Sequence, residues 1–163
     1  MPLSRRFYVT TRTHQVFELA HDLAESLGHD DVTPAHVAIG LIREGRSIAA
    51  QLLSQAVPPD VLERELKAHL PPTGSPRLPP REPSWTPGIE QVLERTIAEA
   101  RELGTEFFGS EHVLLALLRD ETSAPAQVMA HHGVGFEDAR TKIMRAYNAR
   151  PDGSTAGGPS AAV

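Results

Sequence analysis

The fold of this chain is decided by the stretch Glu111-His112-Val113-Leu114-Leu115, because Ala35-His36-Val37-Ala38-Ile39 matches it 76 residues earlier. The same offset relates Thr10 to Thr86. Further pairs at this offset are Val16 and Val92, Ala24 and Ala100, Leu27-Gly28 and Leu103-Gly104, Leu41 and Leu117, and Ala50 and Ala126. Similarity at a fixed separation indicates a duplicated structural unit. We therefore interpret the chain as two copies of one repeat.

Each copy begins with an amphipathic helix. Apolar or small side chains recur at steps of three and four residues, which places them on one face of a helix. They are Thr13, Val16, Phe17, Ala20, Ala24 and Leu27 in copy one, and Ile89, Val92, Leu93, Thr96, Ala100 and Leu103 in copy two. Gly28 and Gly104 follow these stripes, and glycine readily adopts the positive φ that ends a helix. We expect both helices to stop there.

The second helix of each copy, over residues 35–44 and 111–120, is apolar on nearly all sides, which is typical of a buried helix. Thr33-Pro34 and Ser110 provide capping and first-turn residues that start such helices. Two shorter helices follow in each copy, with Ile48, Leu52, Val61 and Leu66 in copy one, and Val128, Met129, Ala139 and Ile143 in copy two. No segment shows the two-residue period of a strand, so the sequence predicts no sheet.

The expected fold is all-α, with two tandem four-helix repeats over residues 10–70 and 85–148 that pack as one pseudo-twofold domain. One repeat alone is near the size at which a core is marginal, which favours this packing. A proline-rich linker over residues 71–84 joins the repeats, since proline disrupts both helix and sheet. We expect an N-terminal arm over residues 1–9. The tail over residues 149–163 has nothing to bury and is predicted to be disordered.

The composition excludes several classes of function. The 163 residues include 16 basic and 21 acidic side chains, a net charge of -5, so there is no electrostatic footprint for nucleic acid or an anionic membrane. The absence of cysteine excludes a disulfide framework, a thiol nucleophile and a thiolate metal site. The longest apolar run, residues 113–118, is far shorter than the ~20 residues of a membrane span. Because no secretory signal pattern is present, we expect a cytoplasmic protein.

The duplicated unit carries a motif in three parts. Copy two contains Trp85-Thr86-Pro87, Ala100-Arg101-Glu102-Leu103-Gly104 and Phe108-Gly109-Ser110-Glu111-His112-Val113-Leu114-Leu115. Copy one contains Val9-Thr10, Ser26-Leu27-Gly28-His29 and His36-Val37-Ala38-Ile39-Gly40-Leu41-Ile42-Arg43-Glu44-Gly45. Over about residues 7–148, this pattern resembles the Clp repeat of ClpC- and ClpA-type unfoldases.

The resemblance implies a receptor for peptide or protein substrates. In such relatives this domain precedes ATPase modules and receives substrates or adaptor proteins. The chain has no Gly-x-x-x-x-Gly-Lys-Ser/Thr loop to hold nucleotide phosphates, so we expect neither ATPase activity nor a cofactor. The leading hypothesis is a non-enzymatic binding module that acts as adaptor, decoy or regulator of a Clp unfoldase or protease.

The resemblance also implies recognition of phosphoarginine, which ClpC-type domains bind with a threonine and a glutamate in each repeat. Carried over residue by residue, the second site is Thr86 with Glu111, and the first is Thr10 with position 35. This chain has Ala35 there, and a methyl group cannot accept the two hydrogen bonds of a guanidinium. Thr10 can still bind a phosphoryl group at a helix start. We expect one working site, in copy two.

Structural roles compete with this interpretation. A glutamate in the first turn of a helix, such as Glu111, stabilises the helix dipole. Thr86 before Pro87 is a good helix cap. His36 and His112 occupy equivalent positions on buried helices and are interpreted as hydrogen-bonded structural residues.

A small-molecule receptor is the alternative hypothesis. Clp amino-terminal domains are targets of cyclic-peptide antibiotics, so the resemblance implies that a free-standing copy could sequester such compounds or other small molecules. Phe7, Tyr8 and Trp85 lie near the repeat starts and keep this alternative open.

A hydrolase that uses histidines and carboxylates is a third alternative. Its metal-dependent version needs ligands at a recognisable spacing. Neither His14 with His21 nor the adjacent pair His131-His132 matches a zinc signature, so we expect no metal.

Overall fold

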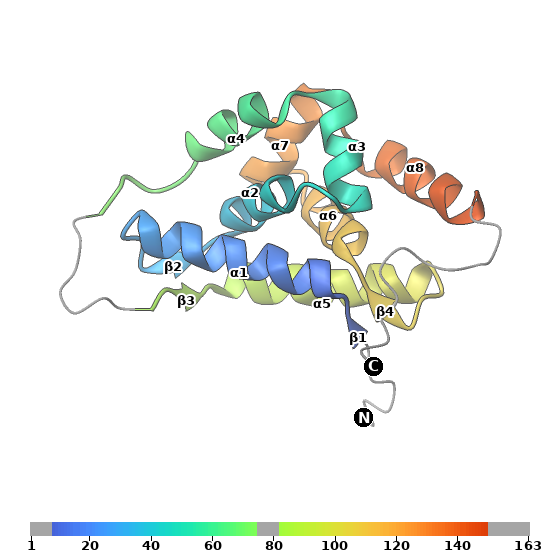
Figure 1. The fold of residues 1–163 in the computed structure, drawn as a ribbon, viewed down its shortest axis with the longest axis horizontal. Coiled ribbons are helices and arrows are strands. Elements are labelled where there is room, and N and C mark those ends of the chain that lie inside the picture. Colours follow the sequence, from blue (N-terminus) through green and yellow to red (C-terminus); the bar gives the residue numbers. More distant parts are fainter. Residues whose placement is uncertain (1–7, 75–81, 150–163) are drawn as a thin grey trace.

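The computed structural model describes residues 8–74 and 82–149, which form eight helices (Figure 1). These are α1 (Thr11–Ser26), α2 (Pro34–Glu44), α3 (Ile48–Ala56), α4 (Pro59–Lys67), α5 (Pro87–Glu102), α6 (Ser110–Arg119), α7 (Ala124–His131) and α8 (Phe136–Asn148). The order of four helices in copy one recurs in copy two, and the all-α class is confirmed. Among the described residues, no helix is long and apolar enough to cross a membrane. Phe7, residues 75–81 of the linker and the tail beyond Ala149 lie outside the described residues.

The two central helices, α2 and α6, contact each other in the middle of the molecule (Figure 1). Their buried side chains include Val37, Ala38, Ile39 and Leu41 from α2, and Val113, Leu114, Leu115 and Leu117 from α6. α4 of copy one also packs on α7 of copy two. A single apolar core therefore runs through both copies, which confirms one pseudo-twofold domain.

The expectation of no sheet is wrong, because the described residues include two short parallel strand pairs. β1 (Tyr8–Val9) pairs with β4 (Phe107–Phe108), and β2 (Asp31–Val32) pairs with β3 (Ser84–Trp85). A strand of two residues is too short to show the alternation that identifies strands in a sequence. Each pair ties the residues before the first helix of one copy to the residues before the second helix of the other.

Two histidines hold the starts of the central helices. The Thr33 backbone N–H donates to Nδ1 of His36 at 2.9 Å, and the Gly109 N–H donates to Nδ1 of His112 at 2.8 Å. Each imidazole thus takes the place of the Glu or Gln that closes a capping box. Both side chains are fully buried, and these bonds confirm their interpretation as structural residues.

Copy one extends this arrangement with a second histidine. Because Nδ1 of His36 accepts from the Thr33 amide, its proton lies on Nε2, which donates to Nδ1 of His29 at 2.9 Å. Burial, and secondarily the neighbouring His29, lowers the pKa of His36 to about 4. Burial also lowers the pKa of His112 to about 4. Both imidazoles are therefore neutral in the folded protein near neutral pH.

α1 and α2 cross with their backbones in contact. A Cβ atom at Gly40 would lie 2.4 Å from the carbonyl oxygen of Val16, closer than two such atoms can approach. The equivalent residue in α6 is Ala116, which is fully buried, so this helix carries a methyl group where α2 has none. The first two helices of copy one thus pack more closely than their counterparts.

Replacing Gly40 by alanine should lower the free energy of unfolding by about 1–3 kcal/mol, because the added methyl group overpacks the crossing. The matched control is Gly88→Ala in the first turn of α5, where a Cβ would make ordinary contacts of 3.5 Å with Pro34 and Thr86. That change should be neutral or stabilising by about 0.5 kcal/mol. Urea unfolding of both variants checks the contrast, and equal effects would contradict it.

The two cap histidines should make the fold sensitive to acid. They bind protons below about pH 6.5 in the unfolded chain but only near pH 4 in the folded protein, so stability falls as the pH falls between these values. By pH 5 the loss should approach about 2 kcal/mol for each histidine. In the double variant His36→Gln/His112→Gln, the amide oxygen can still accept from the backbone but does not titrate.

Urea unfolding at pH 7 and pH 5 measures this loss for both proteins. The two proteins differ only at residues 36 and 112, so the difference between their losses measures the effect of the two caps. A double variant that loses as much stability as the wild type would show that the caps do not titrate as proposed.

Candidate functional site

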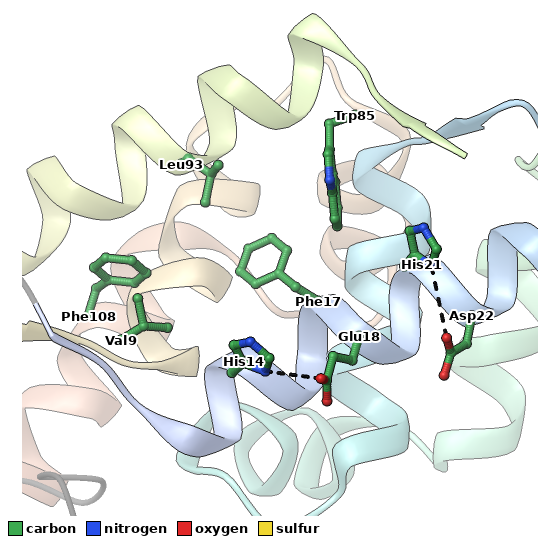
Figure 2. A pocket seen from close by; sticks show the side chains of 9 residues that line it. All are labelled: Val9, His14, Phe17, Glu18, His21, Asp22, Trp85, Leu93 and Phe108. Atoms are coloured by element: carbon green, nitrogen blue, oxygen red, sulfur yellow. Dashed lines mark ion pairs between the residues drawn. The ribbon is translucent and has the colours of Figure 1, made fainter. Parts of the chain in front are cut away.

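An open groove of about 610 Å³ lies between α1 and α5, which run antiparallel on one side of the molecule (Figures 1 and 2). Its lining residues are Val9, His14, Phe17, Glu18, His21, Asp22, Trp85, Leu93 and Phe108. The strand pairs stand at its two ends, with Val9 and Phe108 at one end and Trp85 at the other.

The apolar lining follows the duplication. Phe17 of α1 and Leu93 of α5 are equivalent positions at the 76-residue offset, and so are Val9 and Trp85. Both Phe17 and Leu93 are half-buried against the core and turn their remaining surface to the groove. The helical stripes contained these two residues, but periodicity could not distinguish positions facing the groove from positions facing the core.

Trp85 is the most accessible aromatic side chain of the groove, with 46% of the residue exposed. Its ring meets Phe17 edge-on at 6.1 Å between centroids, and His21 is tilted against it at the same distance. Pairing of β3 with β2 holds the backbone of Trp85. The indole face is thus positioned by the fold but remains open to a ligand. Tyr8 is 57% exposed and is not among the residues that line the groove.

The polar residues of the groove lie along α1. His14 Nδ1 is 3.3 Å from Glu18 Oε1, and His21 Nδ1 is 4.0 Å from Asp22 Oδ1 (Figure 2). Within the described part of the chain, one group could hold a metal ion: His21, Asp22 and Glu25, whose ligand atoms lie within 4.8 Å of one another. Three ligands on one solvent-exposed helix would leave much of the coordination sphere to water. This group differs from the histidine pairs that the sequence suggested as metal ligands, because it combines one histidine with two carboxylates.

Thr10 and Thr86 both cap helices. Thr10 Oγ1 accepts from the Thr13 amide at 3.2 Å at the start of α1, and Thr86 Oγ1 accepts from the Ile89 amide at 3.4 Å at the start of α5. Thr86 Oγ1 also donates to the Val32 carbonyl at 3.0 Å. The capping role expected of Thr86 is confirmed.

Each threonine lies at the start of the second helix of the other copy. The expected pairs, Thr86 with Glu111 and Thr10 with position 35, are therefore exchanged. The Thr10 amide donates to the Phe108 carbonyl at 3.3 Å, so Thr10 lies at the α6 start that carries Glu111. Thr86, bonded to Val32, lies at the α2 start that carries Ala35. The strand pairs cause this exchange. The 16 residues of α5, about 24 Å of helix, separate Thr86 from the Glu111 end.

Glu111 is buried, with 1% of the residue exposed. The Tyr147 hydroxyl, near the end of α8, donates to Glu111 Oε1 at 2.5 Å. A Cβ atom at Gly109 would overlap the Glu111 carboxylate, so the glycine makes room for it. This bond could not be predicted from the sequence, because nothing in helical periodicity links Tyr147 of α8 to the α6 start.

Comparisons with known proteins agree with this architecture. The chain matches the family described as Clp repeat (R) N-terminal domain over residues 8–132 and again over residues 98–161. It is 31% identical over 150 residues to the Bacillus subtilis (strain 168) protein named Negative regulator of genetic competence ClpC/MecB. The match covers 91% of this chain but 18% of that protein.

Solved structures show the same fold at low sequence identity. The Hsp104 N-terminal domain from Candida albicans has a TM-score of 0.70 and 20% identity, and the match covers 88% of this chain and 93% of that one. The N-terminal domain of the caseinolytic protease associated chaperone ClpD from Arabidopsis thaliana has a TM-score of 0.66 and 18% identity, with 91% and 98% covered. The duplicated helices, their crossed strand pairs and the sequence match together establish that this chain belongs to the Clp repeat N-terminal domain family.

Proposed function

We propose that this domain is a non-enzymatic module that binds peptide or protein segments in the groove between α1 and α5. The observation that carries the proposal is an open apolar groove with an exposed tryptophan at one end. Large exposed hydrophobic residues of the described chain are Tyr8, Val9, Trp85 and Met144, and two of these line the groove. Apolar surface that gathers in a concave site is typical of a binding site.

The relatives support a partner in protein turnover. The chain spans about 18% of the length of its Bacillus subtilis relative, so the activity of that larger protein does not transfer with the domain. We infer that the module acts beside a Clp unfoldase or protease as an adaptor, decoy or regulator. A decoy would hold in its own groove the segments that such an unfoldase receives.

A compact cyclic peptide is a second candidate ligand for the same groove. The exposed face of Trp85 and the neighbouring Phe17 offer a rigid aromatic surface at low entropic cost. Sequestration of such compounds would use the groove that we assign to linear segments.

We propose that the α6 start recognises phosphoarginine. The site would use Glu111, as the sequence suggested, but with Thr10 rather than Thr86. Backbone amides at a helix start favour a phosphoryl group, and a carboxylate favours the guanidinium. Because Glu111 is buried and accepts from Tyr147, binding would require Tyr147 to move or to share its acceptor.

Groove binding can be followed through the emission of Trp85, the chain's single tryptophan. A panel of tryptophan-free apolar peptides, linear and cyclic, should change that emission on binding. Leu93→Ser should weaken the affinity about tenfold, because it removes apolar contact from the groove wall.

Met144→Ser is the matched control, since Met144 is exposed on α8 and does not line the groove. It should leave the affinity unchanged. The proposal fails if no peptide alters the emission, or if Leu93→Ser and Met144→Ser behave alike.

Isothermal titration with free phosphoarginine tests the second site. The wild type should bind, and both Thr10→Val and Glu111→Gln should weaken binding by tenfold or more, because each removes a charge-assisted contact. Thr86→Val is the matched control. It removes the equivalent helix cap at the start of α5, far from the proposed site at the α6 start. Absence of detectable binding to the folded wild type would exclude phosphoarginine as a ligand.

A further inference from the structure

We propose that the groove between α1 and α5 selects segments in which an unmodified arginine or lysine lies among apolar residues. This inference rests on the proposed function and specifies which peptides the groove takes. The cation would lie in the groove between the exposed indole of Trp85 and the α1 wall that carries the carboxylates of Glu18 and Asp22. The apolar neighbours of the cation would contact Phe17 and Leu93.

The charged residues of the groove are not repeated in the two copies. Its apolar residues occur on both sides, but its four polar residues, His14, Glu18, His21 and Asp22, all belong to α1. The α5 counterparts of Glu18 and Asp22 are Glu94 and Ala98, and neither lines the groove. The nine lining residues include two carboxylates and no lysine or arginine. One wall is therefore acidic and the other is apolar.

Both carboxylates are available to a ligand. The side chains of Glu18 and Asp22 are 61% and 75% exposed. Their ion-pair neighbours are His14 at 3.3 Å and His21 at 4.0 Å (Figure 2). On the other side of α1 both carboxylates also line a hollow with Arg12, Arg43 and Arg46, so a ligand cation would compete with these arginines. An acidic or phosphorylated segment would meet two like charges at the same place, so the wall also discriminates against anions.

Trp85 supplies the second element of cation recognition. Tryptophan has the aromatic face that attracts cations most strongly, and arginine is the residue most often found over it. Phe17 and His21 pack near the indole at 6.1 Å between centroids and hold it in the groove beside the acidic wall. The methylene stem of an arginine can cover apolar surface while its charged head remains near the carboxylates.

The site differs from the α6 start in both position and charge preference. Trp85 precedes α5, whereas the Glu111 end follows it, so the helix separates the two. A phosphoryl group favours the amides of a helix start, but a free guanidinium favours the acidic groove.

Three peptides that differ in one central residue test the inference. Each carries the same apolar flanks and has arginine, the neutral isostere citrulline or glutamate at the centre. Titration against Trp85 emission should give an affinity for the arginine peptide about tenfold above that of the citrulline peptide. The glutamate peptide should bind more weakly still. Raising the salt from about 50 to about 300 mM should reduce the arginine preference, because the carboxylates are exposed.

The double variant Glu18→Gln/Asp22→Asn should remove most of the arginine preference while the citrulline peptide keeps its affinity. Asp60→Asn on α4, across the molecule from the groove, is the matched control and should keep the preference (Figure 1). If all three peptides bind the wild type equally, the cation inference is overturned while groove binding stands. If no peptide changes the Trp85 emission, both are overturned.

Discussion

The mutual burial of α2 and α6 is the constraint on which the rest of the structure depends. Each helix is apolar on nearly all sides, so neither can be covered by its own copy alone. Packing the two against each other merges two small cores into one. This arrangement leaves α1 and α5 on the outside, each with its apolar face turned inward. The groove forms between α1 and α5 because both helices pack on the central pair α2 and α6.

The short strand pairs have an effect larger than their size. Two residues of pairing contribute little stability, yet β1–β4 and β2–β3 determine which helix start each threonine meets. They also connect opposite ends of α1 and α5, and they place Val9 and Phe108 at one end of the groove and Trp85 at the other. A duplicated chain therefore forms each of its equivalent corners from residues of both copies. Residues that are related within one repeat, such as Thr86 and Glu111, lie at different corners.

Helices and core could be predicted from the sequence because their signals are local and repeated. The stripe through Val16 and Val92, and the all-round apolar pattern of α2 and α6, recur at one offset and reinforce each other. The crossed contacts could not be predicted, since a two-residue strand has no measurable period. The bond from Tyr147 to Glu111 joins residues 36 positions apart through tertiary packing. Helical periodicity places Val16 and Phe17 on the same apolar stripe. It cannot distinguish Val16, which faces the core, from Phe17, which faces the groove.

Divergence of the two copies has kept most of the apolar frame but has changed individual polar residues. Most core positions and the apolar groove residues keep apolar equivalents, because both copies must satisfy the same packing, but buried Leu23 corresponds to buried Glu99. Glu111 has no acidic counterpart at Ala35, whereas Asp22 has no acidic counterpart at Ala98. Asp22 is exposed, where a change costs the fold little, whereas Glu111 and Ala35 are both buried at the helix starts. The pseudo-twofold frame thus fixes where the two helix starts and the groove lie, and the unequal polar residues give each of these places a distinct charge.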